Sequence, residues 1–250
     1  MDLKPNPRLD EWLVEQGHYQ SRSRAREAIR RGCITINGKS IEKPSTKVTR
    51  PDAIKIDDDA SGLVSRAALK LIAALKETDL SPDGKICLDI GASTGGFCQV
   101  LIENGARHVY AIDVGHDQMD EGLLEEAKLT NIEGLNARML SANDLDNVAP
   151  EFLTCDVSFI SLKLALPPAL ELAAPGALGI FLVKPQFEVG KEKLGKGGIV
   201  RDAALLAETV EDIRGWFETQ KGWHMTHLLP SPIHGGDGNQ EYLLVGRKDD

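Results

Sequence analysis

A glycine-rich stretch, LDIGASTGGF at residues 88–97, lies between an apolar run and the start of a helix-like pattern. Backbone amides at a helix start can hold a polar or anionic ligand, and glycine lets the chain approach that ligand closely. Asp113 ends the next apolar run, 22 residues after Gly91, where a carboxylate can accept hydrogen bonds from two ribose hydroxyls. Both features predict a ligand that contains adenosine. The spacing departs from the dinucleotide fingerprint GxGxxG and favours S-adenosylmethionine over NAD, although spacing alone leaves both open.

Two charged residues beside apolar runs are the second candidates for chemistry. Lys184 follows the run FLV in FLVKPQF, and Pro185 disfavours helical geometry at this lysine, which directs its side chain past the end of a strand. A lysine there usually extends its charge into water, so Lys184 alone does not define a site. Asp156 lies within or at the end of the segment FLTCDVSFI, where an unpaired carboxylate would be costly. Lys184 is its natural partner.

The elements that position these groups follow from strand and helix patterns that alternate from residue 85 onward. We expect strands over 85–90, 108–113, 152–160, 176–183 and 241–247, and helices over 95–105, 162–173 and 202–219. Such alternation predicts a mostly parallel sheet with helices on both faces. Ligands of such sheets bind at the carboxyl ends of the strands.

The N-terminal segment has a different pattern and the opposite charge. Residues 1–50 contain 11 Lys and Arg against 6 Asp and Glu, a net +5, whereas residues 51–250 contain 18 against 32, a net −14. One helix begins near Pro7 and stops at Gly17; a second, capped by Ser21 or Ser23, ends at Gly32 and precedes a hairpin around Asn37-Gly38. A basic head on an acidic body indicates a module that binds a polyanion. The segment 57–62, DDDASG, is expected to be the linker.

Composition excludes several classes of protein. The 250 residues are 42% hydrophobic, enough for a sizeable core, and we find neither a signal peptide nor an apolar stretch long enough for a membrane span. The expected location is therefore cytoplasmic. The four cysteines are widely separated and form no CxxC pair, and no histidine has a partner at metal-binding spacing, so neither a disulfide framework nor a metal is expected.

The N-terminal motifs RLD, GHYQSRSRA, IRRG and NGK resemble the small RNA-binding domain named after ribosomal small-subunit protein S-four. Arginines on one helix face can contact phosphate oxygens bidentately, and each neutralised phosphate releases counterions. A solvated arginine face is the alternative. The candidate RNA-binding residues are Arg8, Arg22, Arg24, Arg26, Arg30 and Lys39.

The remaining motifs carry a second resemblance, which covers nearly the whole chain. The loop DIGASTGGF resembles the cofactor loop of RNA ribose methyltransferases related to FtsJ. The segments DVGHDQM, LNARML, CDVSFISL, LVKPQFEVGK, GKGGIVRD and SPIHGGDGNQEYLL are similar to the TlyA family, described both as ribosomal RNA 2'-O-methyltransferases and as hemolysins. This resemblance implies an α/β fold, a Rossmann-like S-adenosylmethionine-dependent methyltransferase sheet with a small N-terminal α+β RNA-binding domain. The domains would span residues 1–60 and 61–250.

The resemblance also implies a set of site residues. The catalytic set would be Lys70, Asp156, Lys184 and Glu241, and the cofactor-binding residues would be Asp89, Gly91, Ala92, Ser93, Gly95, Gly96, Phe97, Asp113, Val114, Asn136 and Arg138. The family usually has two glycines after SR, whereas this chain has Ala67 and Ala68, so we expect Lys70 on a more regular helix. An ordinary solvated helix lysine is the alternative for Lys70.

The implied activity is methyl transfer from S-adenosylmethionine to a ribose 2'-hydroxyl of ribosomal RNA, on cytidine by resemblance, with ribosomal RNA or subunits as partners. A lysine becomes a useful base when burial or a second ammonium lowers its pKa from about 10.4. We therefore expect Lys184 to orient and deprotonate the hydroxyl, Lys70 to add positive potential, and Asp156 and Glu241 to hold the lysines. The alternatives are a non-catalytic RNA-binding factor, a membrane-lytic hemolysin and, least favoured, a nicotinamide oxidoreductase.

Overall fold

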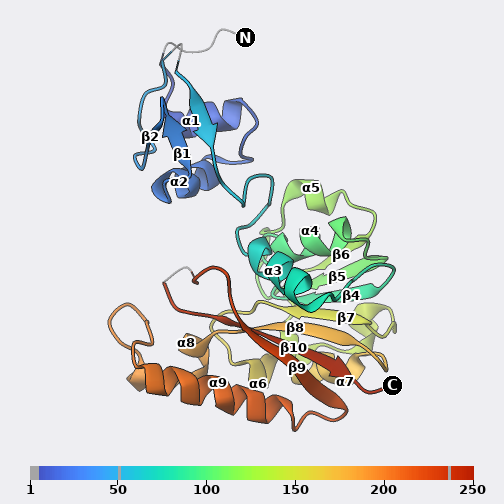
Figure 1. Cartoon of the computed structure of the whole chain (residues 1–250). Helices are drawn as coiled ribbons and strands as arrows, with labels where there is room; N and C mark the ends of the chain where they lie inside the picture. The colour runs from blue at the N-terminus through green and yellow to red at the C-terminus, as the bar shows by residue number, and fades with distance from the viewer. Residues whose placement is uncertain (1–5, 50–51, 236–237) are drawn as a thin grey trace. The chain divides into compact units, whose positions relative to one another are not determined.

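The computed structural model describes residues 6–49, 52–235 and 238–250, and the chain divides into two compact units, Met1–Val64 and Ser65–Asp250. In unit 1 the helices α1 (Leu9–Glu15) and α2 (Arg22–Arg30) precede a small antiparallel sheet (Figure 1). The sheet has the order β2 (Lys39–Ser40), β1 (Ile34–Ile36) and β3 (Ile54–Ile56). The expected hairpin turn has Asn37 and Gly38 at φ 52° and 78°.

Unit 1 has its own apolar core, formed by Leu9 and Leu13 of α1, Ala28 and Ile29 of α2, and Ile34 of β1. Ser21 caps α2, since its side chain accepts a hydrogen bond from the amide of Arg24. The helical spacing of these apolar residues in the sequence is the reason both helices can be read in advance. Strand β3 is not among the expected elements.

The segment 57–62 packs on unit 1 and is not a free linker. Asp58 accepts hydrogen bonds from the Tyr19 hydroxyl at 2.8 Å and from Arg31 Nη2 at 3.0 Å. Ala60 is fully buried, and its carbonyl oxygen accepts a hydrogen bond from Arg24. The prediction of a linker here is wrong because Asp58 has basic and phenolic partners that the local sequence pattern does not reveal.

Unit 2 is built on a seven-stranded sheet of order β6-β5-β4-β7-β8-β10-β9. The strands β4 (Ile86–Ile90), β5 (His108–Ile112), β6 (Leu129–Ile132), β7 (Phe152–Cys155) and β8 (Leu178–Val183) are parallel. Strand β10 (Tyr242–Lys248) is antiparallel to β8 and to β9 (Trp223–Pro230). The central strands are apolar on both sides because helices cover both faces of the sheet.

Helices α3 (Ala68–Thr78) and α4 (Gly96–Glu103) lie on one face of this sheet, and α6 (Leu162–Ala165), α7 (Pro167–Leu172) and α9 (Ala203–Phe217) lie on the other (Figure 1). Shorter helices are α5 (Glu121–Leu124), α8 (Pro185–Glu188), η1 (Ala137–Met139), η2 (Ala142–Leu145) and η3 (Lys191–Lys193). The helix expected over 162–173 is two helices, because the prolines at 167 and 168 begin a new one. The expected parallel sheet with helices on both faces is confirmed.

Candidate active site

Three of the four residues expected to be catalytic lie at the carboxyl ends of the parallel strands. Asp156 follows the last residue of β7, and Lys184 follows the last residue of the neighbouring parallel strand β8. Glu241 precedes β10, whose first residue, Tyr242, pairs with Val183. Because β10 runs antiparallel to β8, its first residue lies beside the carboxyl ends of the parallel strands. Side chains distant in the sequence therefore meet at the carboxyl ends of these strands.

The fourth residue, Lys70, completes a buried ion-pair cluster, which we call the tetrad (Lys70, Asp156, Lys184 and Glu241). Lys70 Nζ lies 2.6 Å from Glu241 Oε2 and 3.8 Å from Asp156 Oδ2, and Lys184 Nζ lies 2.6 Å from Asp156 Oδ1. The side chains are between 3% and 14% exposed. Asp156 therefore bridges the two ammonium groups, and the cluster has two positive and two negative charges.

Lys184 uses its remaining donors on the segment that follows β7. Its Nζ donates to Ser158 Oγ at 2.9 Å and, in a longer contact, to the Asp156 carbonyl oxygen at 3.4 Å. Its backbone is extended, with φ −114° and ψ 93°, as the following Pro185 predicts. Ser158 is a residue that sequence reasoning missed as a site residue. Its place in the motif CDVSF, two residues after Asp156, is the signal that could have found it.

Helix α3 brings Lys70 to the tetrad by packing closely against the start of α4. A Cβ added to Gly96 would lie 2.7 Å from Ser65 Cβ and 3.4 Å from the Ala68 amide nitrogen, so only glycine allows this approach. Ala67 and Ala68 accommodate the packing, and Ala68 is fully buried. The alternative prediction for Lys70, an ordinary solvated lysine on a helix, is wrong, because its side chain is only 7% exposed.

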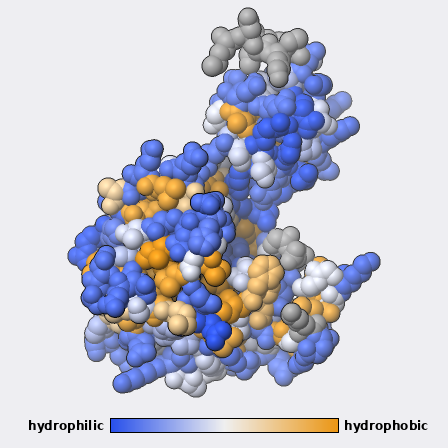
Figure 2. Space-filling model, turned by 180° about the vertical axis from the view of Figure 1, so that it is seen from behind, coloured by the Kyte–Doolittle hydropathy of each residue, from blue (hydrophilic) through white to orange (hydrophobic). Residues whose placement is uncertain are grey.

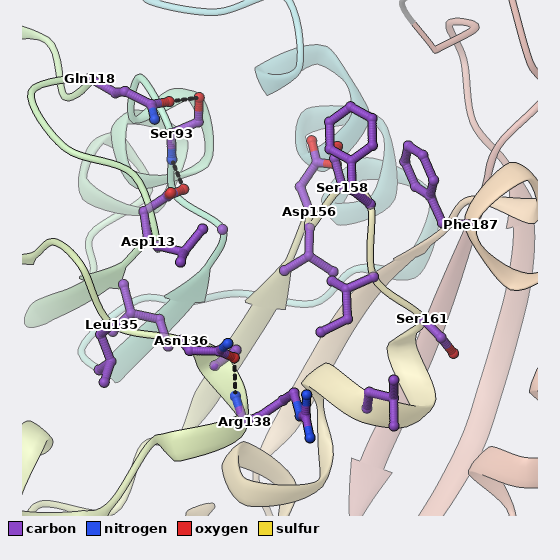
Figure 3. Close-up of a pocket in the computed structure, with 18 residues that line it drawn as sticks. Ser93, Asp113, Gln118, Leu135, Asn136, Arg138, Asp156, Ser158, Ser161 and Phe187 are labelled. Atoms are coloured by element: carbon purple, nitrogen blue, oxygen red, sulfur yellow. Dashed lines mark hydrogen bonds between the residues drawn. The ribbon is translucent and has the colours of Figure 1, made fainter. Parts of the chain in front are cut away.

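Beside the tetrad lies a pocket with a volume of about 950 Å³. Its walls come from the end of β5 and from the segments that follow the parallel strands β4 to β8 (Figure 3). Seven of the expected site residues line it: Gly91, Ser93, Asp113, Val114, Asn136, Arg138 and Asp156. Sequence reasoning missed further lining residues, among them Gln118, Leu135, Ser158, Phe159, Ser161 and Phe187.

Asp113 is the acidic group at the wall of the pocket opposite Asp156 (Figure 3). Its Oδ2 accepts a hydrogen bond from the Ser93 amide at 2.8 Å and its Oδ1 accepts one from the Gly115 amide at 2.7 Å. These bonds fix the carboxylate, and each oxygen keeps a lone pair for a further donor. The arrangement fits a ribose, and the apolar side chains of Val114 and Leu135 provide surfaces for a purine ring.

The glycines of the expected cofactor loop have mainly steric roles. Gly91 has φ 81°, and a Cβ there would lie 3.0 to 3.1 Å from Val157, so glycine lets the chain that leaves β7 approach the loop. Gly95 has φ 91°, and a Cβ there would meet Leu123 and Met119. Four residues expected at the cofactor, Ala92, Gly95, Gly96 and Phe97, are not among those that line the pocket. They shape the loop beneath it.

Asp89 also differs from its expected place. It is 1% exposed in the middle of the sheet, where Thr154 Oγ1 donates to its Oδ1 at 2.8 Å and Cys98 Sγ donates to its Oδ2 at 3.1 Å. Burial raises the pKa of Asp89 to about 6, although these hydrogen bonds oppose the shift. The carboxyl group thus connects β4 to β7 and to α4 and does not line the pocket.

Exposed apolar side chains occur on unit 2 around the pocket. Figure 2 shows apolar patches that interrupt the hydrophilic surface of this unit. Val114, Leu164 and Phe159 line the pocket and are 67%, 52% and 89% exposed. Phe159 packs its ring against Phe187, with 5.0 Å between the ring centroids. Large exposed rings beside a polar cluster are typical of binding surfaces.

In unit 1, three of the arginines expected to bind RNA converge on one buried carboxylate. Asp10 is fully buried and accepts hydrogen bonds from Arg26 Nε at 2.7 Å, Arg8 Nε at 2.9 Å and Arg22 Nη2 at 3.0 Å. Burial alone would raise the pKa of Asp10, but the three guanidinium groups hold it well below its usual value. The guanidinium groups are held in place while their side chains stay 35% to 44% exposed.

The other three candidates in unit 1 differ from one another. Arg24 is 17% exposed and donates to the carbonyl oxygens of Ala60 and Leu63, so it fixes the end of unit 1. Arg30 and Lys39 are exposed on the surface. Arg24 therefore contributes to the fold of this unit, and its exposed neighbours remain available to a polyanion.

Across 6–49, 52–235 and 238–250, no three His, Cys, Asp or Glu side chains are grouped so that they could hold a metal ion. In the same part of the chain, none of the helices has the length and apolar character that crossing a membrane requires.

Comparisons with known proteins agree with the arrangement of both units. The model of the FtsJ-like methyltransferase family matches residues 63–248, and the model of the S4 domain matches residues 7–54. The chain is 42% identical over 237 residues to YqxC of Bacillus subtilis, named as an rRNA methyltransferase, covering 95% of this chain and 84% of that protein.

Two further similarities cover almost the whole chain. The 16S/23S rRNA (cytidine-2'-O)-methyltransferase TlyA of Mycobacterium tuberculosis is 40% identical over 238 residues, which are 95% of this chain and 88% of TlyA. A solved structure from Streptococcus thermophilus, titled a hemolysin, superposes with a TM-score of 0.76 at 36% identity and covers 99% of this chain and 90% of its own. With the S4 domain and the FtsJ-like domain both matched, the chain belongs to the TlyA family of FtsJ-like methyltransferases.

Proposed function

We propose that this chain transfers a methyl group from S-adenosylmethionine to the 2'-hydroxyl of a cytidine ribose in ribosomal RNA. The observation that carries the proposal is the tetrad on the rim of a pocket whose opposite wall holds Asp113. The activity named for the Mycobacterium relative supports the choice of RNA, nucleoside and hydroxyl. Such a substrate would be met in the cytoplasm, where ribosomes are made.

The pocket residues would hold the methyl donor. Asp113 would accept hydrogen bonds from its ribose hydroxyls, while Val114 and Leu135 would flank the adenine. The Arg138 amide donates a hydrogen bond to Asn136 Oδ1 at 3.1 Å, and this bond orients the Asn136 side chain in the pocket (Figure 3). When bound, S-adenosylmethionine supplies a methyl group on a positively charged sulfur, which keeps the electron pair of the broken S–C bond.

The tetrad would prepare the hydroxyl. The hydroxyl oxygen forms the new O–C bond, so its proton must leave. Lys184 Nζ, which contacts the pocket residues Asp156 and Ser158, could receive this proton once its own proton has passed to Asp156 at 2.6 Å. Lys70, 3.8 Å from the same carboxylate, would add positive potential that stabilises the developing alkoxide. Glu241 would hold Lys70 in place.

Phe159 would help to bind the acceptor nucleotide. Its ring is 89% exposed at the mouth of the pocket, one residue from Ser158, which contacts Lys184. Exposed aromatic rings stack on nucleobases, and each stack contributes about 1–3 kcal/mol. A base on this ring would bring its ribose toward the tetrad.

The test is transfer of a tritiated methyl group to purified ribosomal subunits, followed by mapping of ribose 2'-O-methylation and by calorimetry with S-adenosylmethionine. We expect binding of the methyl donor and one or a few modified cytidines. Binding of the donor without transfer to any ribosomal RNA would favour the non-catalytic RNA-binding factor. Dye release from liposomes at a low protein-to-lipid ratio would favour the hemolysin.

A further inference from the structure

The backbone at Phe159 is in a conformation that its neighbours must maintain. Its φ is 66°, in the left-handed region, which is unfavourable for a bulky side chain. Because the ring is 89% exposed, burial of the ring does not hold the residue there. Such a residue persists when the structure on either side of it determines its conformation. The question is which contacts do so.

The segment around Phe159 is fastened on both sides to the segment that follows β8. On one side, Lys184 Nζ donates to Ser158 Oγ at 2.9 Å. On the other side, Glu188 accepts two hydrogen bonds, one from Ser161 Oγ to its Oε2 and one from the Leu162 amide to its Oε1 at 2.8 Å. Between these two attachments, the rings of Phe159 and Phe187 are in contact.

Glu188 itself is not one of the residues that line the pocket, and its two hydrogen bonds are to Ser161 and Leu162, which lie outside the tetrad. Ser161, which does line the pocket, turns its hydroxyl away from Asn136 and Arg138 (Figure 3). Burial raises the pKa of Glu188, so keeping a carboxylate here has a cost that its two hydrogen bonds offset. The charged groups that face it are Lys163 on α6 and Asp212 on α9, which pair with each other at 2.6 Å.

We propose that Glu188 is a positioning residue for the acceptor nucleotide: by holding Ser161 and Leu162, its carboxylate keeps Phe159 in the left-handed conformation that presents its ring at the mouth of the pocket. This inference rests on the proposed function for the nature of the substrate. It goes beyond that function because Glu188 acts through another residue, on the side of the segment opposite Lys184. An alternative is that Glu188 only stabilises the start of α6.

Kinetic measurements with ribosomal subunits as substrate distinguish a positioning role of Glu188 from stabilisation of α6 alone. The variants are Glu188→Ala, Glu188→Gln and Phe159→Ala. We expect Glu188→Ala to raise KM for the subunits by about tenfold, as loss of one base stack predicts, with kcat changed less and the Kd of S-adenosylmethionine unchanged. Glu188→Gln should restore most of the loss, because its amide can accept from Leu162 and donate to Ser161 Oγ. In a Phe159→Ala background, Glu188→Ala should raise KM no further.

Glu151→Ala is the matched control. The Glu151 carboxylate also accepts a hydrogen bond from a backbone amide, that of Ile86 at 2.9 Å. Ile86 begins β4, so this contact lies at the amino ends of the parallel strands, away from the pocket. We expect Glu151→Ala to lower the melting temperature as Glu188→Ala does and to leave KM unchanged. Should Glu188→Ala change only the melting temperature, or should its effect on KM add fully to that of Phe159→Ala, the positioning role is overturned.

A crystal structure of Glu188→Ala provides a readout that does not depend on activity. The proposal expects Phe159 to leave the left-handed region, with its ring displaced from Phe187. A Phe159 φ that stays near 66° with the ring in place would overturn it, even if wild-type protein transfers no methyl group to any RNA. Absence of transfer by the wild type would overturn the proposed function instead. If Glu188→Ala does not fold, Ser161→Ala, which removes one of the two hydrogen bonds to Glu188, gives the same two readouts, and Glu188→Gln remains the comparison that should resemble wild type.

Discussion

Asp156 is the residue on which the charge balance of the tetrad depends. Its two oxygens face two different ammonium groups, Lys184 at 2.6 Å and Lys70 at 3.8 Å. Removing one member of a buried ion pair is strongly destabilising, because the other charge stays buried without compensation. The tetrad therefore has a structural cost as well as a proposed catalytic use, and tests of catalysis must measure folding and cofactor binding alongside turnover.

The first prediction concerns Lys184. Lys184→Ala should lower kcat for methyl transfer by about 10²- to 10⁴-fold, the usual contribution of a positioned base, while the Kd of S-adenosylmethionine measured by calorimetry is unchanged. Lys163→Ala is the control, since Lys163 belongs to the neighbouring helix α6 and pairs with Asp212 on the surface. Full turnover by Lys184→Ala would remove Lys184 from the mechanism.

The second prediction concerns the pH dependence of stability. The folded-state pKa of Asp89 is about 6, above its ordinary value of 3.8. Between these values the folded state holds a proton that the unfolded state has lost, so the contribution of Asp89 to stability falls as pH rises through this window. Asp89→Asn removes that dependence. From pH 4 to pH 7, the free energy of unfolding of the variant should therefore rise relative to wild type by about 3 kcal/mol at most.

Urea unfolding at both pH values checks this prediction. Because any constant effect of the amide cancels between the two pH values, only the difference matters. An equal difference in stability between the two proteins at pH 4 and at pH 7 would contradict it.

Among single residues, the sequence predicts charged groups better than the contacts that orient them. Asp156 and Lys184 stand out because charge interrupts apolar runs. Ser158 and Phe159 do not, because a serine and a phenylalanine after a strand are common. Asp89 misleads for a related reason: an acidic residue next to a glycine loop looks the same in sequence whether it faces the pocket or lies beneath it.

At the scale of elements, the approach of α3 to α4 determines where Lys70 lies. The contact depends on Gly96, since a methyl group there would lie 2.7 Å from Ser65 Cβ. The helical pattern of α3 is legible in the sequence, but its partner is not, because helix periodicity identifies an apolar face without identifying the surface that the face covers.

The third prediction follows from this packing. Gly96→Ala should lower stability by about 1–3 kcal/mol, as overpacking does, and should lower kcat because α3 carries Lys70 away from Glu241. Gly215→Ala is the control within α9, where an added Cβ meets nothing within 4 Å. It should raise stability by about 0.5–1 kcal/mol without changing kcat. Thermal unfolding and single-turnover methyl transfer measure both, and unchanged kcat in Gly96→Ala would contradict the role of this contact.

The strands of the sheet differ in how well the sequence pattern predicts them. Central strands such as β4 and β8 are continuous apolar runs and were predictable. The edge strands β6 and β9 were not, because at a sheet edge LTNI and WHMTHLLP mix polar and apolar residues without a clear alternation. The antiparallel insertion of β10 between β8 and β9 depends on long-range pairing, which no local pattern records.

At the scale of the whole molecule, charge is divided along the chain. Residues 1–50 carry a net +5 and residues 51–250 a net −14. We therefore expect RNA to be attracted mainly by residues 1–50 of unit 1, where Asp10 holds three arginines in place and Arg30 and Lys39 are exposed. The acidic remainder disfavours nonspecific contact with phosphates elsewhere.

The fourth prediction tests this division. Arg30→Ala combined with Lys39→Ala should weaken binding to ribosomal RNA and reduce the slope of log affinity against log salt by about 2, one for each lost phosphate contact. Lys128→Ala combined with Lys221→Ala, two exposed positions of unit 2, is the charge-matched control. Equal slopes for the two double variants would contradict binding through unit 1.

The position of Glu241 has a consequence for biosynthesis. Asp156, Lys184 and Lys70 are all translated well before it, yet the partner of Lys70 arrives with the strand that begins at Tyr242. A nascent chain therefore cannot complete the tetrad before Glu241 has been translated.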